Sequence, residues 1–173
     1  PLAAEAGLNV LKRGGSAVDA AVAMQAMLSL VEPQSSGIGG GAFMTYFDAK
    51  SRQVVVYDGR EVAPAQAAST MFLDESGTPL PFDTAVVSGR ATGVLGAVKM
   101  LASAHGDHGK LPWKEVVAPA VKLAEEGFTV SDALAGSLNW VVGGSSEFPE
   151  LRRVFGKTNG SADWQEGDRL VQK

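Results

Sequence analysis

The feature that most restricts the fold of this chain is a run of four glycines within residues 37–41, which separates two hydrophobic periods. Before it, the stretch AVDAAVAMQAMLSLV at 17–31 is apolar on most faces of a helix, as expected for a mostly buried helix. After it, FMTYFD at 43–48 alternates with the period of a strand. The chain is therefore expected to mix helices and strands around a glycine-rich junction.

The same glycines raise the question of a phosphate-binding loop. Gly37, Gly39 and Ala42 fit the G-x-G-x-x-G/A spacing of dinucleotide-binding loops. Such a loop follows a strand and begins a helix, whereas this run follows a helix and begins a strand. The full G-x-x-x-x-G-K-[ST] pattern does not occur, because the G-K-T at 156–158 has Leu151 where the first glycine would stand, so a P-loop is excluded as well. We interpret the glycines as a helix-to-strand junction that needs positive φ angles and close backbone contact, with a plain turn as the alternative.

Start and stop signals place the other elements. Ser16 and Asp19 form a carboxylate version of the capping box, and Gly14 and Gly127 follow helical stretches as stop signals. The expected helices cover 2–13, 17–31, 93–104 with an end at Gly106, 113–126 with a kink at Pro119, and 132–140. Strands are expected at 43–48, 53–61 and 85–89, and 142–164 is irregular.

Composition excludes several functions. The net charge of -4 disfavours nucleic acid as a partner. The absence of cysteine excludes disulfides, thiolate zinc sites and a cysteine nucleophile. The longest apolar run is interrupted at Gln25 and Ser29 and ends at Glu32, so no membrane span is expected. The chain begins at Pro1 without a signal-peptide pattern, and we expect it to be a piece of a longer protein.

Few side chains could carry chemistry. His105, Asp107 and His108 could ligate a metal, but their spacing is a poor zinc pattern, so no metal and a solvated loop are expected. Ser35 and Ser36 could be nucleophiles on a tight turn, yet no base is identifiable and no G-x-S-x-G elbow occurs.

The remaining candidate is YDGREVAP at residues 57–64. Arg60 stands at a strand end, and Pro64 stops the extended run, so the sequence presents a guanidinium there. A guanidinium can bind a carboxylate through two parallel hydrogen bonds. An ion pair between Arg60 and Glu61 is the alternative, and composition alone favours it.

Several stretches together resemble the γ-glutamyltranspeptidase family. They occur in the family's order over nearly the whole chain: EAGLNVLKRGGSAVDAAVAMQAMLSLVEPQSSGIGGGAFMTYFD, DGREVAPAQAASTMFLD, SGRATGVLGAVKML, GKLPWKEVVAPAVKLAEEGFTVSDALA and GDRLVQ. The resemblance implies an α+β fold, the N-terminal nucleophile hydrolase αββα sandwich, of which residues 1–173 are only a part. They would form a single, incomplete domain at the start of the large subunit.

The resemblance also implies an activity for the whole protein. Such enzymes cleave the γ-glutamyl bond of glutathione and related compounds and transfer the group to water or to an amino acid or peptide acceptor. The precursor cleaves itself into a large and a small subunit, and the threonine that begins the small subunit is the nucleophile, with its own amine as the base. No threonine of this chain lies in such a context, so the isolated chain is expected to be inactive, with no catalytic residue and no cofactor.

The implied partners are a γ-glutamyl donor, an acceptor, and the remainder of the large subunit and the small subunit of the same precursor, in a periplasmic or extracellular location. The Arg of the family's RE-x-AP motif, here Arg60, would bind the α-carboxylate of the donor, and Glu61 would orient its guanidinium. The family's oxyanion-hole glycines belong to the small subunit, so residues 39–41 do not take that role. The alternatives are a glutaryl β-lactam acylase, a poly-γ-glutamate depolymerase, a catalytically retired binding member, or a stand-alone module.

Overall fold

The computed structural model describes residues 1–144, 147–158 and 160–172, which divide into two compact units. The first unit comprises residues 1–37 and 105–173, and the second comprises 38–104. The expectation of a single, incomplete domain stays a prediction. The first unit contains α1 (Leu2–Lys12), α2 (Ala17–Val31), α3 (Pro33–Ser36), α6 (Trp113–Glu126), β3 (Phe128–Thr129), α7 (Asp132–Gly143), α8 (Pro149–Phe155) and β4 (Arg169–Leu170).

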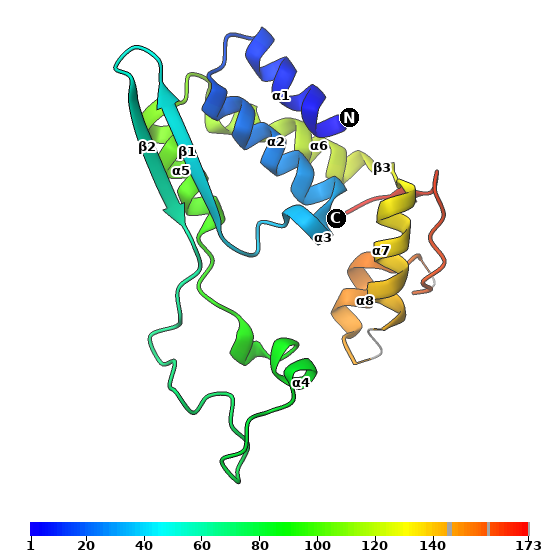
Figure 1. Cartoon of the computed structure of the whole chain (residues 1–173). Coiled ribbons are helices and arrows are strands. Elements are labelled where there is room, and N and C mark those ends of the chain that lie inside the picture. Colours follow the sequence, from blue (N-terminus) through cyan, green and yellow to red (C-terminus); the bar gives the residue numbers. More distant parts are fainter. Residues whose placement is uncertain (145–146, 159, 173) are drawn as a thin grey trace. The chain divides into compact units, whose positions relative to one another are not determined.

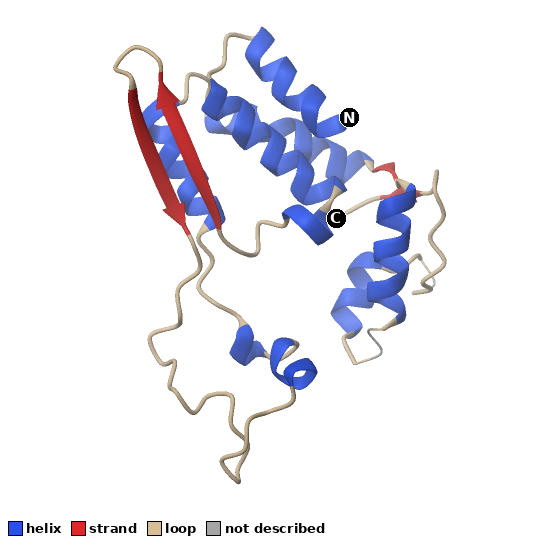
Figure 2. Cartoon of the chain, in the orientation of Figure 1, coloured by secondary structure: helices blue, strands red, loops and turns tan. Residues whose placement is uncertain are grey.

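The second unit contains β1 (Ala42–Asp48), β2 (Gln53–Gly59), α4 (Phe82–Val86), the 3-10 helix η1 (Gly89–Ala91) and most of α5 (Ala97–His108). Strands β1 and β2 form an antiparallel hairpin in which Ala42 pairs with Gly59 and Asp48 with Gln53. The hairpin appears as the red pair of arrows in Figure 2. Its turn closes at Arg52, whose φ of 58° is the positive value that a tight turn requires.

The helices of the first unit pack closely because small residues lie at their contacts. Helices α1 and α2 lie side by side (Figure 1), and a Cβ added at Gly7 would come within 2.6 Å of Met24 Cγ. The capping box is confirmed: Ser16 Oγ accepts from the Asp19 N–H, and Asp19 Oδ2 accepts from the Ser16 N–H. Gly127, with φ of 83°, ends α6, which continues through Pro119.

The C-terminal part of the first unit has a core of its own. Leu134, Leu138 and Trp164 are buried there with residues of α2, β3 and β4. The Trp164 indole N–H donates to the Phe155 carbonyl, and Asn139 exchanges two hydrogen bonds with the Trp164 backbone. The segment that we expected to be irregular therefore contains α8 and is fixed by one buried tryptophan; residues 145, 146 and 159 lie outside the described residues.

Two elements differ from the sequence-based expectation. The apolar run at 85–89 is not a strand, because residues 82–86 form α4 and Ser88 precedes η1. Helix α5 begins at Ala97 rather than near Gly93 and continues past Gly106 to His108. A Cβ at Gly106 would meet nothing within 4 Å, so this glycine costs the helix some stability without ending it.

Candidate functional site

The glycine-rich segment is the frame of the candidate site in the second unit. The Gly40 carbonyl accepts from the N–H groups of Gly96 (3.2 Å) and Ala97 (3.1 Å) at the start of α5. A Cβ added at Gly41 would lie 2.7 Å from the Gly59 carbonyl oxygen and even closer to Glu61 Oε2. None of the glycines at 37–41 has a positive φ. The expectation of a helix-to-strand junction with close backbone contact is confirmed, whereas that of positive φ angles is wrong.

Gly59 and Gly96 form a second close backbone contact beside the first. A Cβ at Gly96 would lie 2.7 Å from the Gly59 carbonyl carbon and 3.1 Å from the Arg60 carbonyl oxygen. A Cβ at Gly59 would meet Met100 Cβ at 2.5 Å. Backbone atoms cannot move aside as a side chain can. These glycines therefore fix the position of the end of β2 and of the Arg60 backbone that follows it.

Arg60 and Glu61 follow directly after this contact. The Arg60 N–H donates to Asp58 Oδ1 at 2.8 Å, which holds the backbone at the end of β2. Arg60 Nε lies 3.5 Å from Glu61 Oε2, and their side chains are 73% and 39% exposed, respectively. The ion pair expected as the alternative therefore exists, but it is long and it uses only one edge of the guanidinium, which leaves the Nη atoms able to bind a ligand.

A cavity of about 550 Å³ opens beside this pair. Arg60, Glu61, Arg90 and Thr92 contribute polar groups to it, and Gly39 and Gly93 form part of its wall. Two guanidiniums and one carboxylate give the cavity a net positive charge, and its volume is typical of small-molecule sites. Its chemistry suits the binding of an anion such as a carboxylate, which a guanidinium holds through parallel hydrogen bonds.

The histidine cluster is not the solvated loop that we expected. His105 and His108 lie in α5, and the His105 side chain is only 15% exposed. Its Nε2 lies 3.2 Å from Asp19 Oδ1 and 2.9 Å from the Leu111 carbonyl oxygen. Since both partners are acceptors, Nε2 carries a hydrogen. Among the described residues, no group of three or more His, Cys, Asp or Glu side chains could hold a metal ion.

Asp19 is fully buried and joins α2 to the segment that follows α5. Its Oδ2 accepts from the N–H groups of Ser16, Lys110 and Leu111. Burial alone would raise the pKa of Asp19, but these hydrogen bonds more than offset it and hold the pKa below its usual 3.8. Because the folded pKa is lowered, this contribution to stability is present above the unfolded pKa and is lost as the pH falls through the folded one.

Asp19→Asn is expected to destabilise the protein by about 2–4 kcal/mol, because an amide nitrogen cannot accept these hydrogen bonds and an amide oxygen accepts them without charge. The measurement is the urea midpoint at pH 7 and again at pH 3, where the loss should shrink as the wild-type carboxylate becomes protonated. Asp132→Asn, in the first turn of α7, is the matched control. An equal loss at both pH values would contradict this role of the charge.

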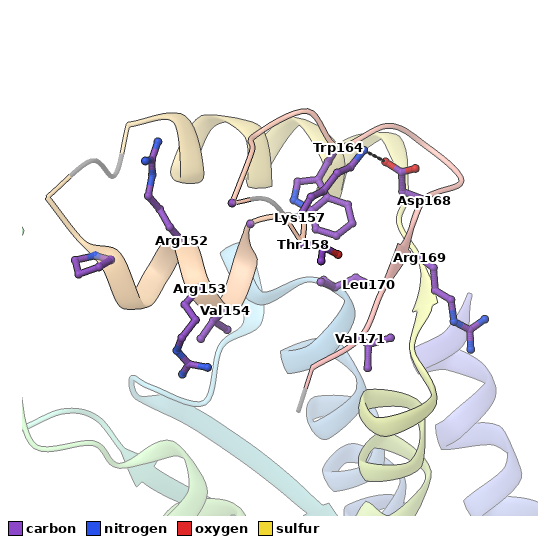
Figure 3. A pocket seen from close by; sticks show the side chains of 13 residues that line it. Arg152, Arg153, Val154, Lys157, Thr158, Trp164, Asp168, Arg169, Leu170 and Val171 are labelled. Carbon is purple, nitrogen blue, oxygen red and sulfur yellow. Dashed lines mark ion pairs between the residues drawn. The ribbon is translucent and has the colours of Figure 1, made fainter.

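Another cavity, of about 720 Å³, lies in the first unit and is a poorer candidate. Figure 3 shows the side chains of Arg152, Arg153 and Arg169 pointing in different directions rather than toward one point. Lys157 pairs with Asp168 at 2.8 Å, and this hydrogen bond raises the pKa of Lys157. The charge of Lys157 is thereby balanced, so the described residues that line this cavity do not direct a set of cations toward one point where an anion could bind.

The fold defines the class of protein first. The solved γ-glutamyltranspeptidase of Helicobacter pylori superposes with a TM-score of 0.91 at 36% identity, over 99% of this chain and 48% of that one. The chain therefore has part of the α+β fold of the N-terminal nucleophile hydrolases, as predicted. A cephalosporin acylase from Bacillus halodurans also superposes, with a TM-score of 0.82 at 27% identity, over 99% of this chain and 32% of that one.

The sequence then defines the family. The family model described as gamma-glutamyltranspeptidase matches residues 3–173, and the chain belongs to this family. The glutathione hydrolase proenzyme of Bacillus subtilis strain 168 is 44% identical over 178 aligned residues, which cover 100% of this chain and 29% of that protein. The chain thus spans less than a third of the length of this relative.

Sequence reasoning singled out Arg60 and Glu61, whose roles stay predictions, but it did not reveal the residues that contact them or share their cavity. The contact of Gly59 with Gly96 and the place of Arg90 in the same cavity depend on residues far apart in the sequence. Gly96 was the one hint of this contact in the sequence, because it interrupts a helical pattern.

Ser35 and Ser36, considered as nucleophiles, lie in the other unit, where the Ser36 carbonyl accepts from Gln25 and Ser29. Among the described residues, no helix is both long and apolar enough to span a bilayer.

Proposed function

We propose that the protein to which this chain belongs hydrolyses or transfers the γ-glutamyl group of glutathione and related donors, and that Arg60 binds the α-carboxylate of the donor. One observation carries this proposal: Arg60 lines a positively charged cavity, and the close contact between Gly59 and Gly96 fixes the backbone next to it. Membership of the γ-glutamyltranspeptidase family and the relatives named glutathione hydrolase support the choice of donor.

The residues that line the cavity indicate which part of the reaction this chain would serve. Its charged groups can bind and orient a carboxylate, so this part of the protein selects the donor. The nucleophile, the acceptor site and the small subunit would come from the rest of the precursor, and the isolated chain would have no turnover. We extend the proposal to a periplasmic or extracellular location, which the family resemblance alone supports.

The test uses the whole protein. Self-cleavage into two subunits and release of p-nitroaniline from γ-glutamyl-p-nitroanilide are the expected results. A whole protein that cleaves itself but does not act on this donor would overturn the proposal. Hydrolysis of a glutaryl β-lactam in its place would favour the acylase alternative, which the likeness to the cephalosporin acylase supports.

Glu61 is proposed to orient Arg60 rather than to touch the donor. Its carboxylate lies against Gly40 and Gly41 and approaches Arg60 Nε. In the whole protein, Glu61→Gln is expected to raise KM for the donor about two- to tenfold with little change in kcat, because the exposed pair is worth about 1 kcal/mol. The increase should shrink in high salt, since screening weakens the wild-type pair. A fall in kcat at constant KM would contradict a positioning role.

A further inference from the structure

The cavity beside Arg60 contains a second guanidinium, that of Arg90 in η1. Arg90 Nη1 donates to the Met71 carbonyl at 3.0 Å and to the Leu73 carbonyl at 3.5 Å. Within residues 1–144, 147–158 and 160–172, no carboxylate lies close enough to Arg90 to form an ion pair. The charge of this side chain is therefore balanced neither by Glu61 nor by any other described acidic group.

The two hydrogen bonds to carbonyl groups orient the Arg90 side chain but use only some of its hydrogen-bond donors. A guanidinium has five N–H donors, and the contacts in the described part of the chain use Nη1 only. The Nε and Nη2 donors thus remain for a ligand in the cavity. An oriented guanidinium loses less side-chain entropy when it binds a carboxylate than a freely rotating one does.

We propose that Arg90 determines donor specificity by binding a second carboxylate of the γ-glutamyl donor, beyond the bond that is cleaved. This inference rests on the proposed function, in which Arg60 holds the α-carboxylate. A γ-glutamyl peptide such as glutathione carries a second carboxylate at its C-terminal end, and a γ-linked glutamate polymer carries one on its next residue. Two cations in one cavity match a donor with two such anions.

The competing explanation is purely structural. Arg90 joins η1 to the segment around Met71 and Leu73, and this alone could account for its two hydrogen bonds. A structural role affects every donor alike, since it acts through the shape of the cavity. A specificity role affects only donors that carry the second carboxylate, so a pair of donors differing in that group separates the two explanations.

The experiment compares glutathione with its glycine ethyl ester, and with a γ-linked glutamate trimer, in the self-cleaved whole protein. The wild type, Arg90→Gln, Arg90→Lys and the control Arg52→Gln, which changes an exposed arginine in the hairpin turn, are assayed by kcat/KM. The wild type is expected to prefer glutathione over the ester by about five- to tenfold, as for one exposed charge-assisted hydrogen bond.

Arg90→Gln should abolish this preference by lowering kcat/KM for glutathione and for the trimer but not for the ester, Arg90→Lys should retain part of the preference, and Arg52→Gln should retain all of it. Equal losses for all donors, or an Arg90→Gln variant that still discriminates, would overturn the inference while γ-glutamyl activity persists. A self-cleaved wild type that acts on none of the donors would overturn the proposed function, and the inference with it.

Discussion

Arg60→Lys in the whole protein is expected to raise KM for γ-glutamyl donors by about ten- to a hundredfold, with a smaller effect on kcat. Lysine keeps the positive charge but loses the planar fork, so one of the two parallel hydrogen bonds to the α-carboxylate cannot form. The long contact between Arg60 Nε and Glu61 Oε2 leaves this fork to the donor. The measurement is steady-state release of p-nitroaniline from γ-glutamyl-p-nitroanilide.

Two controls make the Arg60 result specific. Arg52→Lys makes the same chemical change in the exposed hairpin turn, outside the cavity, and should leave KM unchanged. Normal cleavage of the Arg60→Lys precursor into two subunits shows that its fold is intact. If the variant cleaves itself normally and its KM equals that of the wild type, Arg60 does not bind the carboxylate.

Local signals predicted the parts of the fold that depend on neighbouring residues. Ser16 with Asp19 and the glycine at 127 marked helix ends correctly because a cap is formed within a few residues. The prediction of a strand at 85–89 was wrong because a few apolar residues do not distinguish a strand from a short helix. The end of α5 was misplaced because Gly106 weakens a helix without breaking it.

Long-range contacts explain what the sequence could not predict about the site. Asp19 was recognised as a cap, but its bonds to Lys110 and Leu111 come from more than 90 residues away. Arg60 was singled out only through the family motif, because composition alone favours an ion pair where an arginine precedes a glutamate at a strand end. The closeness of Arg90 to the same cavity depends on the path of the chain between residues 62 and 94, for which no local rule exists.

Gly96→Ala is expected to lower both the stability of the protein and its kcat/KM for the donor. The added Cβ would lie 2.7 Å from the Gly59 carbonyl carbon, nearer still to the carbonyl oxygen, and 3.1 Å from the Arg60 carbonyl oxygen. These are backbone atoms, so either α5 or the end of β2 must shift. Overpacking of this kind costs about 1–3 kcal/mol, and a displacement of Arg60 by about 1 Å can lower kcat/KM by about a hundredfold.

The matched control for Gly96→Ala is a glycine inside α5, the helix that begins directly after Gly96. At Gly106 an added Cβ meets nothing within 4 Å, so Gly106→Ala should raise stability by about 0.5–1 kcal/mol with unchanged kinetics. Thermal unfolding, self-cleavage and donor kcat/KM of the two variants are compared in the whole protein. Because the contact of Gly96 is with the backbone that carries Arg60, its variant should lose donor affinity even where it still cleaves itself. A Gly96→Ala protein with wild-type stability and kcat/KM would show that this backbone contact does not position the guanidinium.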